Sequence, residues 1–299
     1  MESPLLLLLT FLFLGALWAS SAAAAAIVFT LHNSCPSTVW PGTLSGNGAA
    51  VLGGGGFELP SEATASFSAP PGWSGRFWAR THCNFSASSS SSSSCATGDC
   101  SGALRCTLGG ATPVTLAEFT LAPASGGQDF YDVSLVDGYN VGIGILLHVK
   151  TISELFSLGI TAMPPPHAAA AAKVESGANT TVCGYAGCLG DVNEQCPPEL
   201  RVTLPTLSTS GAATKVVACR SACAAFGAAE YCCTGAYGDP STCRPTKYSR
   251  IFKMACPAAY SYAYDDPTST FTCPAGARYL ITFCPTSKTP STTTRTGRS

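Results

Sequence analysis

The chain has 299 residues, of which 46% are hydrophobic, 11% are charged and 16 are cysteines. This composition excludes an intrinsically disordered protein and a collagen-like fibre, because neither combines so much apolar sequence with so many cysteines. The 16 Lys and Arg nearly balance the 17 Asp and Glu, so the net charge is only −1. Neither nucleic acid nor an anionic membrane surface is therefore an expected partner.

The first 26 residues are a predicted signal peptide. The apolar run Leu5–Trp18 has the length of a signal-peptide core and is too short to span a bilayer comfortably. The small residues of Ala19–Ala24 would allow cleavage, although Glu2 stands where a basic residue is usual. We therefore expect a secreted protein without a membrane span.

Short apolar or alternating runs follow the signal as far as Tyr139, separated by Gly, Pro and Ser. This pattern is typical of an antiparallel sandwich or barrel. The run Ser88–Ser94 cannot bury apolar surface and is expected to form a surface loop. The expected strands are Ile27–Leu31, Ala65–Ser68, Arg76–Thr81, Thr115–Leu121 and Asp129–Val136.

The second half of the chain is organised differently. Residues 141–180 form an atypical insert, in which Ile152–Ile160 fits a short amphipathic helix. We interpret the insert as a tolerated surface loop or retained non-coding sequence rather than a functional element. Cysteines crowd residues 183–273, where Cys219 and Cys223 are expected on one face of a helix that ends at Phe226. Arg278–Cys284 is an expected strand, and 286–299 is a polar tail.

An even number of cysteines in a secreted chain predicts eight disulfides. Zinc is the alternative, but Cys-x2-Cys pairs and Cys/His clusters are missing, so neither a metal nor a cofactor is expected. Spacing alone leaves the pairing open. Cys232 and Cys233 are adjacent, and each is expected to bond elsewhere because a bond between them would be strained.

The segment Cys95–Cys106, with the sequence CATGDCSGALRC, resembles the signature of the thaumatin-like proteins, the plant defence family (pathogenesis-related group 5) that includes osmotin and zeamatin. The resemblance covers 27–141 and 181–285. It implies a mainly β fold, a thaumatin-like antiparallel β-sandwich (27–140 and 274–285) with a disulfide-rich, partly helical second lobe (183–273). The other matching segments are Thr38–Pro41, Phe77–Thr81, Thr115–Phe119, Tyr131–Asn140, Glu230–Cys233, Tyr248–Lys253 and Asp265–Cys273.

The resemblance also implies how the cysteines pair. One bridge would join the two ends of the mature chain, and the set would give a kinetically stable, protease-resistant molecule. The implied pairs are Cys35–Cys284, Cys83–Cys95, Cys100–Cys106, Cys183–Cys273, Cys188–Cys256, Cys196–Cys219, Cys223–Cys232 and Cys233–Cys243.

The family has an acidic cleft between sandwich and lobe, described by one Arg, one Glu and three Asp. Spacing alone would favour the interpretation that the Arg and the carboxylates form solvated surface contacts. The resemblance instead favours the interpretation that they line the cleft. Clustered carboxylates can accept hydrogen bonds from sugar hydroxyls, while the Arg keeps one of them ionised. The matching residues are Arg80, Glu118, Asp132, Asp137 and Asp265, with Asp266 as the alternative to Asp265.

Strand parity adds a constraint on two of these carboxylates. Asp132 and Asp137 are five residues apart and would face opposite ways on a regular strand. A turn at Asp137-Gly138 must therefore redirect the second side chain.

The resemblance implies a monomeric defence protein of the apoplast that binds fungal cell-wall β-1,3-glucan and has an antifungal effect. The alternatives are a weak endo-β-1,3-glucanase, with Glu118 as acid and Asp132 or Asp137 as its partner, and an inhibitor of microbial wall-degrading enzymes. Binding is favoured over catalysis. Asn84 and Asn179 are expected glycosylation sites. The residues Trp40, Trp73 and Trp78 are more expected in the core than as sugar platforms.

Overall fold

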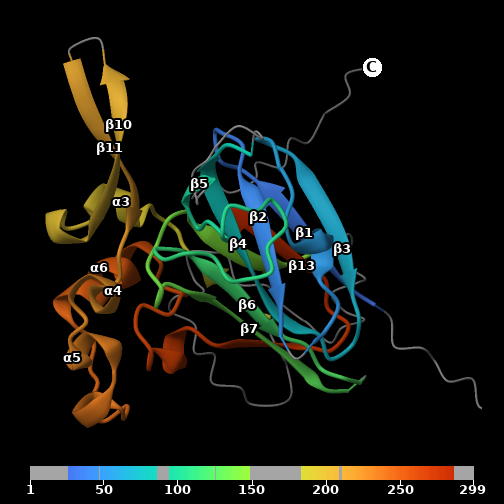
Figure 1. Cartoon of the computed structure of the whole chain (residues 1–299). Coiled ribbons are helices and arrows are strands. Elements are labelled where there is room, and N and C mark those ends of the chain that lie inside the picture. Colours follow the sequence, from blue (N-terminus) through green and yellow to red (C-terminus); the bar gives the residue numbers. More distant parts are fainter. Residues whose placement is uncertain are drawn as a thin grey trace, which may run out of the picture.

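The computed structural model describes residues 26–46, 48–85, 94–124, 126–148, 183–208 and 211–285. The predicted signal peptide, the helix at Ile152–Ile160, the site at Asn179 and the polar tail lie outside the described residues. Figure 1 shows a β-sandwich with a separate lobe of short helices beside it and a hairpin that projects from the lobe. Within the described residues, every helix is too short or too polar to cross a lipid bilayer.

The sandwich has two sheets. One sheet of six strands has the order β12-β7-β6-β4-β2, with β5 paired to β4, and the other has the order β3-β1-β13-β8-β9. The strands of the first sheet are β2 (Trp40–Ser45), β4 (Ser74–Cys83), β5 (Cys95–Thr97), β6 (Leu116–Thr120), β7 (Gln128–Ser134) and β12 (Phe271–Pro274). Those of the second are β1 (Ile27–Asn33), β3 (Thr64–Ala69), β8 (Ile143–Leu147), β9 (Ala186–Gly187) and β13 (Tyr279–Phe283). The mainly β fold is therefore confirmed.

The core between the sheets is aromatic. The Phe29 ring packs against the rings of Phe77, Phe119 and Tyr279, with centroids 4.7–5.7 Å apart. Because side chains alternate along a strand, the neighbours of these residues point away from the core. This alternation places the outward residues of β4, β6 and β7 on the open face of the six-stranded sheet.

The lobe is built from short elements. Its longest helix, α6, begins with a capping box in which Thr246 and Ser249 satisfy each other's backbone N–H groups. The elements are α3 (Val192–Gln195), η3 (Pro198–Leu200), β10 (Arg201–Ser208), β11 (Gly211–Cys219), α4 (Ala222–Phe226), α5 (Ala229–Cys232), η4 (Gly235–Tyr237), α6 (Lys247–Ala255) and η5 (Asp266–Thr268). A further 3-10 turn, η2 (Leu52–Gly55), lies in the sandwich.

Two expectations from the sequence are wrong. The helix expected from Cys219 begins only at Ala222, where the Ser221 side chain caps it, and Cys219 instead ends strand β11. The start of the expected insert is part of the sandwich, because β8 pairs with β13 and the side chains of Ile143 and Ile145 are fully buried. These apolar residues therefore pack in the core of the sandwich.

All sixteen cysteines form eight disulfides, and none is free. The pairs are those that the family resemblance implies. The bridge Cys35–Cys284 spans 249 residues of sequence and lies beside the parallel pairing of β1 with β13. Both chain ends of the sandwich are therefore joined covalently.

Candidate functional site

A row of charged side chains crosses the open face of the six-stranded sheet. Arg76 of β4 stands opposite Glu118 of β6, which stands opposite Asp132 of β7. Directly opposed residues have Cβ atoms about 4.5–5.5 Å apart, so the three side chains are immediate neighbours. Glu118 thus lies between an arginine and a second carboxyl group.

The row lies in an open groove of about 320 Å³. Ser74 and Thr120 line it together with the charged row, and Leu44 lies opposite Arg76 at one end. Phe130 also lines the groove, two residues before Asp132 and hence on the same face, and 48% of its surface is exposed. The groove therefore combines carboxylates, hydroxyl groups and an exposed aromatic ring.

Two further aspartates approach the row. A turn after β7, closed by the bond from the Gly138 N–H to the Leu135 carbonyl, brings Asp137 within electrostatic range of Glu118. The glycine has a φ of +97°, which explains why the turn is made there. Asp266 lies within electrostatic range of Asp132 and accepts a 2.9 Å hydrogen bond from the Tyr260 hydroxyl.

Burial and like charge alter the titration of the two central carboxyl groups. Burial, the nearby Glu118 and the nearby Asp266 raise the pKa of Asp132 to about 8. Burial also raises the pKa of Glu118, opposed by Arg76 and reinforced by Asp137. Asp132 is consequently mostly protonated at neutral pH.

The raised pKa of Asp132 predicts a pH-dependent stability. The folded state binds this proton up to about pH 8, whereas an unfolded Asp loses it near pH 4, so Asp132 lowers stability progressively between these values. At pH 9, the free energy of unfolding of Asp132→Asn should therefore exceed that of the parent by on the order of 3 kcal/mol. At pH 3 the two proteins should differ little. Denaturation curves at both pH values measure this. If the free energies of unfolding of variant and parent differed by the same amount at pH 3 and pH 9, the raised pKa of Asp132 would be refuted.

Asp265 and Asp266 have different roles in the structure. Asp265 forms a 2.9 Å ion pair with Lys253 and accepts hydrogen bonds from the backbone N–H and hydroxyl of Ser261. Lys253 also donates to the carbonyl of Ala259, so the pair holds the segment that carries Tyr260 and Asp266. Of the two, Asp266 is therefore the aspartate that approaches the charged row, although it is not among the residues that line the groove.

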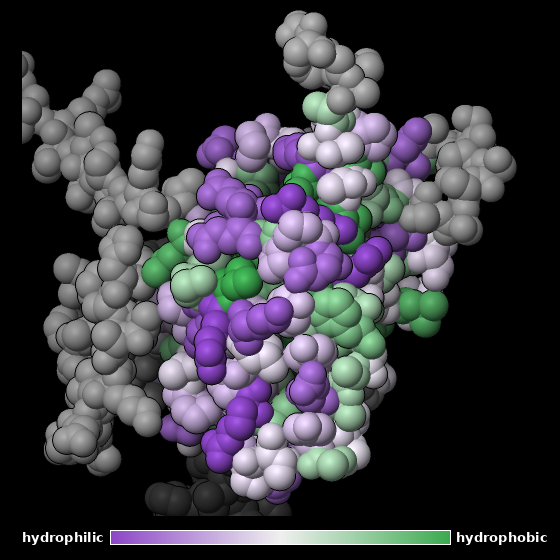
Figure 2. Space-filling view, turned by 90° about the vertical axis from the view of Figure 1, so that its left-hand side faces the viewer, coloured by the Kyte–Doolittle hydropathy of each residue, from purple (hydrophilic) through white to green (hydrophobic). Residues whose placement is uncertain are grey.

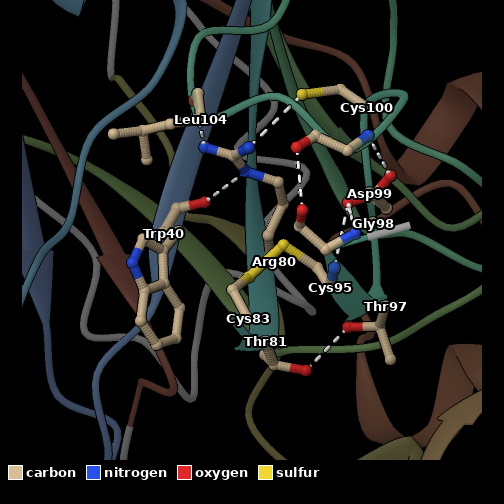
Figure 3. Close-up of a disulfide and its surroundings, with 12 residues drawn as sticks. Trp40, Arg80, Thr81, Cys83, Cys95, Thr97, Gly98, Asp99, Cys100 and Leu104 are labelled. Carbon is tan, nitrogen blue, oxygen red and sulfur yellow. Dashed lines mark hydrogen bonds between the residues drawn. A yellow bond between two sulfur atoms is a disulfide. The ribbon is translucent and has the colours of Figure 1, made fainter. Parts of the chain in front are cut away.

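Arg80 is not part of the charged row. Its side chain is fully buried, and its guanidinium donates to the backbone carbonyls of Trp40, Ala103 and Leu104 (Figure 3). Burial lowers the pKa of Arg80 to about 10, while Asp99 acts in the opposite direction. The guanidinium therefore ties the disulfide-bonded loop after β5 to the sheet, and the expectation that Arg80 lines the cleft is not met.

Arg76 and Phe130 are the residues that sequence reasoning missed. Arg76 and Arg80 lie four apart on one strand, so parity gives them the same face and could not separate them. The pairing register of β4 with β6 distinguishes the two arginines, because it places Arg76 opposite Glu118. The turns between the strands set this register. The position of Phe130, two residues before Asp132, was a usable signal for an aromatic side chain on the acidic face.

The structure also locates the other predicted residues. Trp73 and Trp78 are almost completely buried, in keeping with a core role, and Trp40 is partly buried against Phe85. Asn84 is exposed at the end of β4. Among the described residues, no group of three or more His, Cys, Asp or Glu could hold a metal ion.

Comparison with known proteins identifies relatives over most of the chain. The model of the thaumatin family matches residues 33–285. Pathogenesis-related protein 5 of Arabidopsis thaliana is 53% identical over 266 residues, 89% of this chain and 93% of that protein. Pathogenesis-related thaumatin-like protein 3.5 of Cryptomeria japonica is 51% identical, with the same coverage. A protein of Prunus avium named glucan endo-1,3-beta-glucosidase is 44% identical, over 89% of this chain and 94% of its own. This chain belongs to the thaumatin family.

Proposed function

We propose that this protein is a secreted defence protein that binds β-1,3-glucan of fungal cell walls in the groove on the six-stranded sheet and thereby impairs fungal growth. The observation that carries the proposal is Phe130, an exposed aromatic ring beside the row of Arg76, Glu118 and Asp132. Exposed aromatic side chains next to polar groups are typical of sites that bind an amphipathic ligand.

A sugar chain fits the chemistry of this groove. An ionised carboxylate accepts hydrogen bonds from sugar hydroxyl groups, and a neutral carboxyl group can also donate one. The apolar face of a sugar ring can pack on Phe130. The row from Leu44 to Asp132 crosses three gaps between strands of about 4.8 Å each, or about 14 Å, which provides room for several sugar units. The near-neutral net charge of −1 fits an uncharged polymer as the ligand.

Secretion is supported by the disulfides. Eight bridges form and persist only in an oxidising compartment such as the extracellular space. The exposed Asn84 would carry a glycan on the same route. The names of the relatives, pathogenesis-related proteins, fit a protein released to act on a microbe.

Glu118→Gln and Phe130→Ala should each reduce co-sedimentation of the protein with insoluble β-1,3-glucan, about tenfold in apparent affinity, because each removes a central polar or stacking contact. Cellulose, which has β-1,4 linkages, is the polymer control, and Tyr237→Ala, which removes an exposed ring of the lobe, is the protein control. The proposal fails if the parent does not sediment with the glucan, or if both groove variants sediment as the parent does.

Hydrolysis of the same glucan is the second candidate, and the protonated Asp132 beside Glu118 favours it. Asp132 and Glu118 lie directly opposite each other on neighbouring strands, with Cβ atoms about 5 Å apart, and a retaining glycosidase uses two carboxyl groups that lie close together. Asp132 would donate the proton to the leaving oxygen and Glu118 would be the nucleophile, which reverses the assignment from sequence. One relative is named glucan endo-1,3-beta-glucosidase.

Release of reducing ends from soluble β-1,3-glucan tests the enzyme directly. The parent should release them with retention at the anomeric carbon, visible by NMR, and Asp132→Asn should release none while still binding. A parent that binds the glucan and releases nothing leaves only the binding function.

A further inference from the structure

The face of the molecule that carries the lobe is mixed in character. Figure 2 shows that the hydrophobic side chains of the described residues occur there singly or in small groups among hydrophilic ones. Large protein interfaces have a more continuous hydrophobic core. A surface better suited to a ligand is the groove on the six-stranded sheet, where Arg76 is the cation among the lining residues.

The guanidinium of Arg76 is not tied to the protein by a polar contact. Among the described residues it forms neither a hydrogen bond nor an ion pair, and Glu118 interacts with it only electrostatically. Its N–H groups can therefore donate to a ligand. A long side chain without a fixed place loses conformational entropy when it binds, so packing that fixes Arg76 beforehand would strengthen binding.

The backbone of Gly109 supplies such packing. A Cβ atom at position 109 would lie 2.9 Å from Nη2 and 3.7 Å from Cζ of Arg76, whereas an ordinary contact of a Cβ atom begins at 3.4 Å. The guanidinium thus occupies the space that a side chain at position 109 would need. The φ of Gly109 lies outside the left-handed range, so the backbone itself would accept an alanine.

The segment that carries Gly109 is held at both ends. The disulfide Cys100–Cys106 fixes the residue at which the segment starts. At its other end, the Ala111 N–H donates a 2.7 Å hydrogen bond to the Asp99 carbonyl. The segment therefore has little freedom to move away from the sheet.

The neighbouring Gly110 holds the same segment against β4. It lies on the buried ring of Trp78, since a Cβ atom at position 110 would be 2.6 Å from Nε1 of that ring. The same Nε1 donates a 2.9 Å hydrogen bond to the Gly98 carbonyl. Where Gly109 meets Arg76, the backbone is therefore the fixed partner and the end of the long side chain is the one that can move.

We propose that Gly109 is a positioning residue for the groove: it leaves room for the guanidinium of Arg76 and holds it beside Glu118, where its N–H groups meet the hydroxyl groups of the bound glucan. This rests on the proposed binding of glucan in the groove. The loop that buries Arg80 would then continue into a segment that fixes Arg76 at the edge of the groove.

Gly109→Ala tests the proposal by titration calorimetry with laminarihexaose. The variant should bind about fivefold more weakly than the parent, a smaller loss than the at least tenfold expected for Arg76→Met, because the guanidinium is displaced rather than removed. In the Arg76→Met background, Gly109→Ala should change the affinity less than twofold, because no guanidinium remains to be displaced. Gly190→Ala is the matched control, since a Cβ atom at this exposed glycine would make only ordinary contacts of 3.6 Å or more.

A second measurement follows Arg76 without any ligand. Burial raises the pKa of Glu118, and Arg76 opposes this rise. Gly109→Ala should therefore raise the pKa of Glu118 further, in the same direction as Arg76→Met and by less. An NMR titration of the Glu118 carboxyl carbon measures both changes, and a loop that had only lost stability would leave this pKa unchanged.

The outcomes distinguish this proposal from glucan binding itself. If Gly109→Ala leaves the affinity or the pKa of Glu118 as in the parent, or weakens binding equally in the Arg76→Met background, Gly109 does not position Arg76 and the groove remains. If the parent does not bind laminarihexaose, glucan binding fails, and the pKa of Glu118 alone decides whether Gly109 fixes Arg76. If Gly109→Ala lowers stability, adding Arg76→Met should restore it, and a failure to do so contradicts the proposed contact.

Discussion

Arg80→Met is expected to lower the free energy of unfolding by about 3–5 kcal/mol, because each buried acceptor that is left unpaired costs about 1–3 kcal/mol. The Arg80 side chain is fully buried, and its guanidinium satisfies the carbonyls of Trp40, Ala103 and Leu104. Methionine fills part of the volume but leaves these acceptors unpaired in the interior, where each lacks water as a substitute. Urea denaturation followed by tryptophan fluorescence would measure the loss.

Arg76→Met is the matched control, because it makes the same chemical change four residues away on the same strand. Arg76 lies at the partly exposed groove, so its loss should change stability by no more than about 1 kcal/mol. Equal destabilisation by the two variants would contradict the division of roles between a structural Arg80 and a groove-lining Arg76.

Removing the bridge Cys35–Cys284, by Cys35→Ala together with Cys284→Ala, is expected to lower the free energy of unfolding by about 5 kcal/mol. The bridge closes a loop of 249 residues, and the entropy that it removes from the unfolded chain grows with the logarithm of loop length. It also secures the parallel pair of β1 and β13, which no short turn connects.

The matched control removes a short bridge instead. Cys223 and Cys232 are only nine residues apart, so Cys223→Ala together with Cys232→Ala should lower stability by about 3 kcal/mol. Equal losses from the long and the short bridge would show that local strain and contacts, rather than the entropy of the unfolded chain, determine what each disulfide contributes.

Much of the fold could be predicted because its signals are local. Alternation in Arg278–Cys284 predicts that Tyr279, Ile281 and Phe283 share a buried face, and all three are fully buried. The pattern could not predict that Cys219 ends a strand, because cysteines four residues apart also fit a helix. Cys219 is in a strand because β11 pairs with β10 along its whole length. Strand β8 was missed because its apolar residues had no visible partner until β13 was placed beside it.

The site shows the same limit. Glu118 and Asp132 were identified from motifs, and the register of β6 with β7 places them side by side. Asp265 and Asp266 are adjacent in sequence, and only the ion pair of Asp265 with Lys253 distinguishes them. Residue type and strand parity could therefore identify the acidic groups, whereas the choice between near neighbours required tertiary contacts.

Calorimetric titration of the parent and of Arg76→Met with laminarihexaose is the most direct test of the acidic groove as a glucan site. The account predicts measurable binding by the parent and an affinity at least tenfold weaker in the variant, whose free energy of unfolding stays within about 1 kcal/mol of the parent's. No heat of binding with the parent, or equal affinity in the two proteins, would contradict it.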